Sequence, residues 1–187
     1  MAKKASGINN INGNFKGKDI LSLDQFSPND IKTVLKLAKK MKAIAVKAKP
    51  SKILAGNIVT LIFYEPSSRT FGSFGASVKH LGGQTIEIVD PQHFSSVSKG
   101  ETLEDTMRVF EAYSDAIVIR HPKAGTAKIA AENVNIPVIN AGDGIGEHPS
   151  QALLDLCTID EKHGRLNNLT GVMVGDLLNG RTVHSLI

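Results

Sequence analysis

Short apolar runs alternate with amphipathic segments along most of this chain of 187 residues. Five of the runs are rich in β-branched residues and are typical of buried strands. They cover residues 58–64, 85–89, 116–119, 137–140 and 171–174. Around them, apolar residues recur at helical spacing, which predicts helices. The expected helices are residues 28–49, 67–82, 102–113, 126–133, 149–163 and a last one that begins at 180.

The order of these elements predicts an α/β fold, a parallel sheet flanked by helices, because strand–helix–strand units wind into such sheets. We expect residues 18–165 to form this domain. Residues 1–17, rich in Lys, Asn and Gly, are expected to be a flexible arm. The strand at 171–174 and the helix after it predict the beginning of a second α/β domain over residues 166–187, truncated in this chain.

Composition and charge exclude several classes of protein. Hydrophobic residues make up 41% of the chain and charged residues 21%, as in soluble globular proteins. No apolar run is long enough to span a membrane and the N-terminus has no signal-peptide core, so we expect a cytoplasmic protein. The net charge is +4, but much of the excess lysine decorates one face of the helix at 28–49. With 5% aromatic residues and no RNA-binding signature, neither a nucleic-acid nor a membrane partner is expected.

The single cysteine, Cys157, cannot form an internal disulfide framework. It falls on the apolar face of the helix at 149–163, where we expect it to pack rather than to act as a nucleophile. The spacing of His, Cys and Asp gives no metal site, and no Ser/His/Asp order supports covalent catalysis. We therefore expect no metal and no cofactor.

Four polar residues, Ser67, Ser68, Arg69 and Thr70, stand at the junction between a strand and a helix. Free backbone N–H groups and the positive end of the helix dipole point outward at such a junction, which suits a phosphate group. The alternative is an ordinary serine N-cap beside a solvated arginine. The tetrapeptide alone leaves both interpretations open.

Further polar side chains follow two other predicted strands. Arg120 ends the strand at 116–119, while His148 and Gln151 follow the strand at 137–140. Ligands of parallel sheets bind beyond the carboxyl ends of the strands, so these residues and the tetrapeptide are expected on one rim. Pro149 suits the first position of a helix, and the helix dipole there favours a neutral His148 that donates to a carbonyl oxygen. A histidine that only caps and packs is the alternative.

Five stretches, taken together, resemble the aspartate/ornithine carbamoyltransferase family. They are FYEPSSRT, SSVSKGETLEDT, IRHP, INAGDGIGEHPSQALLDL and VGDLLNGRTVHSL, in family-like order and spacing from Phe63 onward. The phosphate signature of the family usually reads S-T-R-T-R followed by S-F-E. Here Ser68 replaces the threonine, Phe71 replaces the second arginine and Gly75 replaces the glutamate. The last two changes affect pairing along the helix more than the turn that faces the phosphate.

The resemblance implies roles for the rim residues. Ser67–Thr70 would bind the phosphate group of carbamoyl phosphate, and Thr70 would also reach its carbonyl oxygen. Arg120 and His148 would donate to that oxygen, which makes them, with Thr70, the catalytic residues. Gln151 would hold the carbamoyl amide.

The resemblance also implies a second substrate and protein partners. Lys99 and Arg181 would bind L-aspartate, whose amine would accept the carbamoyl group in a step of pyrimidine synthesis. Ser95 and Lys99 would belong to a loop that completes the active site of a neighbouring subunit in a homotrimer. A regulatory chain or fused enzymes of the same pathway are further partners that the family implies.

Three other functions are alternatives to a carbamoyltransferase that uses aspartate. Family members that use ornithine typically read H-P-C-Q where this chain reads H-P-S-Q, and they lack an equivalent of Lys99; the loop with Ser95 and Lys99 and the GRTVHSL segment favour aspartate. A non-catalytic module that binds carbamoyl phosphate or serves assembly gains weight from the expected truncation. A dinucleotide-binding domain would need a G-x-G-x-x-G motif after its first strand, and this chain has none there.

Overall fold

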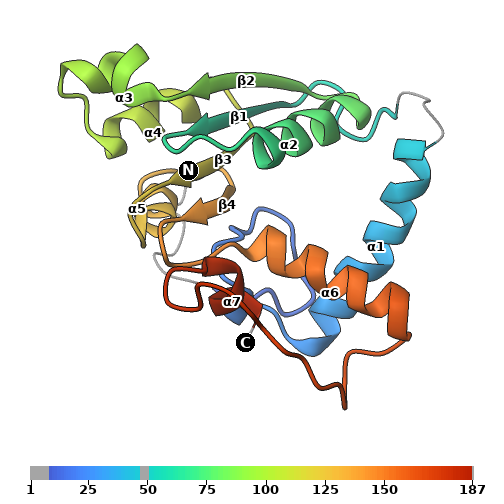
Figure 1. Ribbon diagram of the computed structural model, residues 1–187. Helices are drawn as coiled ribbons and strands as arrows, with labels where there is room; N and C mark the ends of the chain where they lie inside the picture. The colour runs from blue at the N-terminus through green and yellow to red at the C-terminus, as the bar shows by residue number, and fades with distance from the viewer. Residues whose placement is uncertain (1–8, 47–50, 187) are drawn as a thin grey trace.

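A computed structural model describes residues 9–46 and 51–186 of the chain, apart from the side chains of Phe94, Arg181 and Thr182. Within this part, four strands form one parallel sheet in the order β2-β1-β3-β4 (Figure 1). The strands are β1 (Ile58–Phe63), β2 (Gln84–Val89), β3 (Ala116–His121) and β4 (Val138–Asp143). The sheet runs both ways from β1, so the chain reverses its winding direction between β2 and β3.

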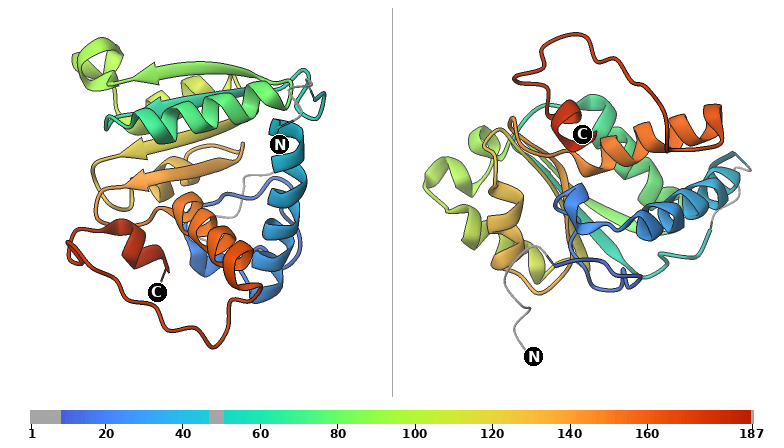
Figure 2. Two further views of the ribbon diagram at one scale, coloured as in Figure 1. Left: turned by 45° about the vertical axis from the view of Figure 1, so that its right-hand side comes forward. Right: turned by 90° about the horizontal axis from the view of Figure 1, so that it is seen from below.

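Helices cover both faces of the sheet, which confirms the predicted α/β fold. Helices α4 and α5 lie on one face, and α1, α2 and α6 lie on the other (Figure 2). The helices are α1 (Pro28–Val46), α2 (Ser68–His80), α3 (Pro91–Phe94), α4 (Leu103–Glu111), α5 (Thr126–Glu132), α6 (Pro149–His163) and α7 (Arg181–Leu186), with 3₁₀ turns η1 (Leu23–Gln25) and η2 (Ser96–Lys99).

Side chains along β1 point alternately to the two faces of the sheet, so this one strand contributes to the packing on both faces. Leu61 and Phe63 pack into the apolar cluster beneath α2, whereas Ile62 and Tyr64 belong to the cluster beneath α4 and α5. Leu61 and Ile62 are both 0% exposed. A strand that is buried on both faces reads as a continuous apolar run, and this run made β1 recognisable in the sequence.

The N-terminal segment differs from the expected flexible arm. Residues 1–8 lie outside the described part, but from residue 9 the chain packs against the domain. Ile11 is 1% exposed, and its backbone N–H donates to the carbonyl of Gln25 at 2.9 Å. The backbone N–H of Gly13 donates to Asp30 Oδ1 at 2.8 Å. The polar composition of this segment gave no indication that it packs against the domain. One buried isoleucine and local hydrogen bonds are enough to anchor it.

The strand expected at 171–174 is wrong, since these residues have no strand geometry and pair with no described strand. Val172 and Val174 are 83% and 92% exposed. A β-branched run becomes a strand only where neighbouring strands take its hydrogen bonds and bury its side chains, and residues 165–180 run outside the sheet (Figure 1). The predicted end of the first helix at 47–49 lies outside the described residues.

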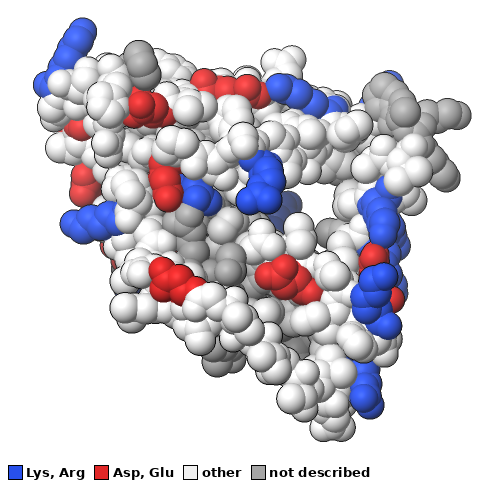
Figure 3. Space-filling model, viewed as in Figure 1, with Lys and Arg blue, Asp and Glu red and all other residues white. Residues whose placement is uncertain are grey.

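Ion pairs join the exposed lysine face of α1 to α6. Lys39 Nζ lies 2.7 Å from Asp160 Oδ2, and Lys42 Nζ lies 2.9 Å from Glu161 Oε1. The carboxylate of Asp160 raises the pKa of Lys39. Figure 3 shows lysine and arginine side chains along the edge formed by α1, with acidic side chains among them.

Candidate functional site

The polar segments that the sequence placed on one rim do lie at the carboxyl edge of the sheet. The segment Ser67–Thr70 follows β1 and opens α2, Arg120 is the penultimate residue of β3, and His148 follows β4 and precedes α6. All four strands point toward the left in Figure 1, so the loops that carry these residues gather at that edge. Parallel sheets place their ligand sites there.

The first turn of α2 has the geometry expected of an anion site. Ser67 occupies the N-cap position, and its side chain makes no capping hydrogen bond. Ser68 and Arg69 are exposed, and Thr70 is half-buried. Ser67 therefore holds the cap position without the side-chain hydrogen bond of an ordinary cap, and its hydroxyl does not take up the N–H groups of the first turn. These N–H groups and the helix dipole suit a negatively charged ligand.

Arg120 is held by contacts on both sides of its guanidinium. Its Nη1 donates to the carbonyl of Ala141 at 3.1 Å, and its Nη2 lies 3.2 Å from Glu65 Oε2. The Arg120 side chain is 9% exposed, whereas that of Glu65 is 34% exposed. Sequence reasoning missed Glu65, although it stands within the FYEPSSRT stretch. The pair fixes the arginine at the rim while its carboxylate partner remains accessible.

His148 sits at the N-cap of α6 with Pro149 at the first helical position, as the sequence predicted. It is 5% exposed, and its ring makes no capping hydrogen bond, so of the alternative of a histidine that only caps and packs, the packing alone remains. Its Nδ1 lies 3.2 Å from Ser150 Oγ. Its backbone N–H donates to Ser185 Oγ of α7 at 2.8 Å, and that hydroxyl donates to Glu147 Oε2 at 2.7 Å.

A cavity of about 280 Å³ between α2 and α6 brings together three of the predicted site residues. Thr70 lines it from α2, while His148 and Gln151 line it from the start of α6. The other lining residues are Ser73, Phe74, Ser77, Ser150 and Leu154. The Nε2 of Gln151 donates to Asp155 Oδ1 at 3.0 Å, which orients the amide within its helix. Segments about eighty positions apart in the chain thus share one small cavity.

Four other predicted site residues stand on the same rim but do not line this cavity, namely Ser67, Ser68, Arg69 and Arg120. Three more lie elsewhere or outside the described part. Ser95 donates to the carbonyl of Pro91 at 2.7 Å and accepts from the backbone N–H of Val97 at 3.2 Å, so it stabilises the turn at η2. Lys99 is exposed at the end of η2. Neither lines the cavity between α2 and α6. The backbone of Arg181 begins α7, and its side chain lies outside the described residues.

The two departures from the family signature on α2 have packing partners. The Phe71 ring meets the Phe63 ring edge-on, with centroids 5.2 Å apart and planes at 87°. Gly75 is buried, and a Cβ there would lie 3.5 Å from Glu87 Oε1. The Glu87 carboxylate accepts from Lys79 Nζ at 2.7 Å and Thr85 Oγ1 at 2.6 Å, and these hydrogen bonds lower its pKa. An aromatic contact and a β2 carboxylate thus occupy the sides of α2 where the family signature has charged side chains.

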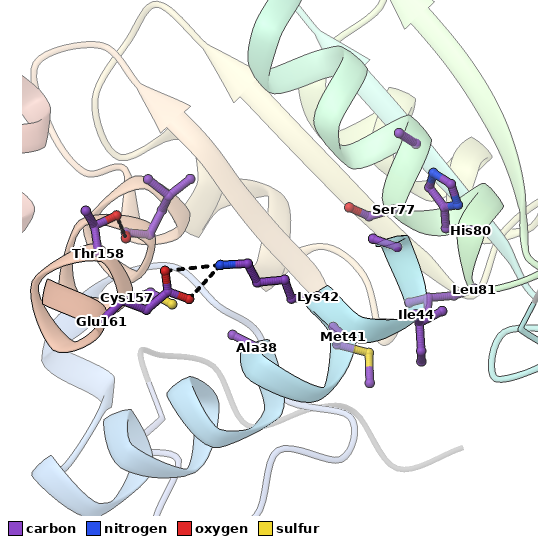
Figure 4. A pocket seen from close by; sticks show the side chains of 13 residues that line it. Ala38, Met41, Lys42, Ile44, Ser77, His80, Leu81, Cys157, Thr158 and Glu161 are labelled. Carbon is purple, nitrogen blue, oxygen red and sulfur yellow. Dashed lines mark hydrogen bonds and ion pairs between the residues drawn. The ribbon is translucent and has the colours of Figure 1, made fainter. Parts of the chain in front are cut away.

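A larger cavity of about 650 Å³ lies between α1, α2 and α6, and none of the predicted site residues lines it. Its walls are mainly apolar, with Met41 and Ile44 from α1 and Leu81 beyond α2. Lys42 reaches across toward Glu161 on one side (Figure 4). This cavity has an apolar lining without a convergent set of catalytic groups. The smaller cavity, by contrast, is lined by three of the predicted site residues.

Over residues 9–46 and 51–186, no group of His, Cys, Asp and Glu side chains is arranged to hold a metal ion. Among the same residues, none of the helices has the length and apolar character needed to cross a bilayer.

His121, the last residue of β3, lies beside Arg120 and was missed in the sequence. Its ring lies 4.7 Å from the Tyr64 ring, and the backbone N–H of Lys123 donates to its Nδ1 at 3.0 Å. Burial lowers the pKa of His121 below its ordinary value of 6.5. An Nδ1 that accepts a hydrogen bond cannot also carry a proton, so this geometry needs the neutral ring.

Acidification is therefore expected to destabilise the fold through His121. Below pH 6.5 the unfolded chain takes up a proton at this residue that the folded chain binds less well, so the stability falls as the pH falls. In His121→Asn, the amide oxygen can still accept from Lys123 but does not titrate. The unfolding temperature of the wild type should drop further between pH 7.5 and 5.5 than that of the variant. Equal drops would show that His121 does not contribute.

Comparison with known proteins agrees with the geometry. The family model described as "Aspartate/ornithine carbamoyltransferase, carbamoyl-P binding domain" matches residues 18–161. The chain is 48% identical over 172 residues to a chloroplastic aspartate carbamoyltransferase of Arabidopsis thaliana, covering 92% of this chain and 44% of that protein. It is 50% identical over 173 residues to the aspartate carbamoyltransferase catalytic subunit of Leptospira biflexa, covering 92% and 56%.

Solved structures give the same result. Aspartate transcarbamoylase from Trypanosoma cruzi, in complex with carbamoyl phosphate and aspartate, superposes with a TM-score of 0.87 at 44% identity, covering 91% of this chain and 53% of that one. The chain thus spans about half the length of the relatives that it matches. The matched span includes every strand of the sheet and the loops that carry Ser67–Thr70, Arg120 and His148. The chain belongs to the aspartate/ornithine carbamoyltransferase family.

Proposed function

We propose that this chain carries the carbamoyl-phosphate site of an aspartate carbamoyltransferase, which transfers the carbamoyl group to the amine of L-aspartate in pyrimidine synthesis. The observation that carries the proposal is the cavity shared by Thr70, His148 and Gln151, since the resemblance assigns all three to one substrate. The names of the relatives support aspartate as the acceptor. The matched span supports residues 18–165 as the domain that binds carbamoyl phosphate.

The described residues suit the charge changes of this reaction. The amine of aspartate attacks the carbonyl carbon, a C–N bond forms, and the bond from that carbon to the phosphate oxygen breaks with its electron pair leaving on phosphate. The attacking amine loses a proton. Negative charge develops first on the carbonyl oxygen, where Arg120 and His148 would donate, and then on the phosphate, where Ser67–Thr70 and the α2 dipole would stabilise it.

Positioning is the other contribution that the site would make. Carbamoyl phosphate and aspartate are both anions, and they must be held together against their mutual repulsion. Arginine is suited to this task because its planar fork binds phosphate or carboxylate in a bidentate manner. Holding the two reactants in reacting geometry can lower the barrier by about 7 kcal/mol or more.

The aspartate side of the site would draw on residues outside the cavity. We place Lys99 and Arg181 on the carboxylates of aspartate, and the loop with Ser95 and Lys99 in the active site of a neighbouring subunit of a homotrimer. Two observations support this arrangement: Lys99 is exposed, and neither it nor Ser95 lines the cavity of its own chain. We expect the enzyme to act in the cytoplasm, although the plant relatives are named chloroplastic.

Calorimetry with carbamoyl phosphate tests the proposal directly. Arg69→Ala removes a guanidinium from the exposed first turn of α2, and charge-assisted hydrogen bonds contribute about 1.5–3 kcal/mol each, so affinity should fall about 10- to 100-fold. Arg108→Ala is the matched control, because this exposed arginine of α4 pairs with Asp105 at 3.1 Å and belongs to no proposed site. If Arg69→Ala bound carbamoyl phosphate as tightly as the wild type, the phosphate assignment would be wrong.

A further inference from the structure

Asp143, the last residue of β4, is a buried carboxylate to which the proposed reaction gives no role. It is 5% exposed and lies opposite His121 in the pairing of β3 with β4, where the register shifts. Burying a charged group is costly unless hydrogen bonds compensate for the lost water. The contacts of this carboxylate therefore indicate what it is for.

Both carboxylate oxygens of Asp143 accept hydrogen bonds from backbone groups of two different loops. Oδ2 accepts from the backbone N–H of Gly125 at 2.7 Å, and Oδ1 accepts from that of Glu147 at 2.7 Å. The side-chain amide of Asn140 donates to Oδ1 at 3.3 Å. The two short bonds have the length of charge-assisted hydrogen bonds, which are about twice as strong as neutral ones.

The two loops joined by Asp143 carry the two proposed donors to the carbonyl oxygen. Residues 121–125 directly follow Arg120, and residues 144–147 directly precede His148. The loops also touch each other, since the backbone N–H of Gly144 donates to the carbonyl of His121 at 2.8 Å. A displacement of either loop would change the distance between the guanidinium and the imidazole.

We infer that Asp143 is a positioning residue that sets the spacing of Arg120 and His148 around the carbonyl oxygen of carbamoyl phosphate. The inference rests on the proposed function, because that function gives both side chains one target. Only a carboxylate fits the role. An asparagine offers one acceptor oxygen and an amide NH₂, so one of the backbone N–H groups would face another donor and its loop would move.

Asp143→Asn tests the inference with two ligands that share a phosphate. Inorganic phosphate would use Ser67–Thr70 alone, whereas carbamoyl phosphate would also need the carbonyl donors. In the variant we expect the ratio of carbamoyl-phosphate affinity to phosphate affinity to fall about tenfold. Phosphate affinity itself should stay within about twofold of the wild type. General loosening of the fold would weaken both ligands and leave the ratio unchanged.

Asp115→Asn is the matched control. Its Oδ2 also accepts a backbone N–H, that of Ile58 at 2.8 Å, but at the start of β1 and so at the opposite edge of the sheet. This variant should keep the wild-type ratio. A wild-type ratio in Asp143→Asn, with the protein folded, would overturn the positioning role.

A second variant keeps the test decisive if Asp143→Asn does not fold. A Cβ at Gly146 would lie 2.8 Å from Asp143 Oδ1, so Gly146→Ala pushes on the same carboxylate without removing it. It should also lower the ratio of carbamoyl-phosphate affinity to phosphate affinity, and an unchanged ratio would overturn the inference.

The proposed function has a separate test in the same measurements. If the wild type bound carbamoyl phosphate no better than phosphate, the proposed function itself would fail, a result distinct from an unchanged ratio in the variants.

Discussion

Replacing Gly144 with alanine is expected to lower the free energy of unfolding by about 3 kcal/mol. Gly144 has a φ of +57°, a left-handed conformation that costs a residue with a Cβ about 1–2 kcal/mol. A Cβ there would also overlap the carbonyl oxygen of Pro122 and lie 2.9 Å from the backbone nitrogen of Ala124. Backbone atoms cannot move aside as a flexible side chain can, so the two loops would have to separate. Urea unfolding, with unchanged slope, measures the loss.

Gly164→Ala separates the two causes. Gly164 ends α6 at a similar φ of +67°, but a Cβ there would meet nothing within 4 Å. Its replacement should therefore cost only the conformational strain, about 1 kcal/mol. Equal losses in the two variants would show that the approach to Pro122 is not tight. A larger loss for Gly144 would also predict weaker carbamoyl-phosphate binding, because the loops of Arg120 and His148 meet at this glycine.

Replacing Phe63 with alanine is expected to cost about 4 kcal/mol, within the usual range for a buried aromatic residue. Phe63 is 1% exposed, at the end of β1 and beneath the first turns of α2. Its loss would leave a cavity between sheet and helix and would remove the edge-on contact with Phe71. Since the segment Ser67–Thr70 begins four residues later, phosphate binding should weaken as well. Chemical denaturation and calorimetry on one protein sample measure both effects.

Phe63→Leu is the corresponding control. It keeps most of the buried volume and should cost less than half as much, about 1.5 kcal/mol. If alanine and leucine were equally destabilising, the ring contact rather than the filled volume would dominate. If neither reduced the stability by more than about 1 kcal/mol, the packing of α2 on β1 would not be a main support of the fold.

Most of the sheet could be predicted from the sequence because β1, β3 and β4 are buried on both faces. Apolar β-branched runs such as 58–64 and 116–119 leave little alternative to a strand. The end of β4 was harder: Ala141, Gly142 and Asp143 are weak strand formers, yet pairing with β3 extends the strand to Asp143. The prediction for residues 171–174 erred in the opposite direction, because their composition suits a strand but no described neighbour pairs with them.

The site could be predicted only as far as side chains act on a ligand directly. Motifs identified Thr70, His148 and Gln151, which share a cavity. They gave no sign of the contacts that Glu65, His121 and Asp143 make with the loops around the site. The supporting contacts depend on which loops meet, and this follows from tertiary packing rather than from local sequence. The role of Asp143 is an example, since its partners Gly125 and Glu147 belong to separate loops.

Phe71 and Gly75 have a consequence for how this sequence could evolve. Where the family signature pairs an arginine with a glutamate one turn later, this chain has an aromatic ring on Phe63 and a gap next to Glu87. Restoring the arginine alone would lose the ring contact without gaining its acidic partner. Restoring the glutamate alone would set two carboxylates against each other. The arginine–glutamate pair of the signature can therefore be introduced here without loss only if both positions change together.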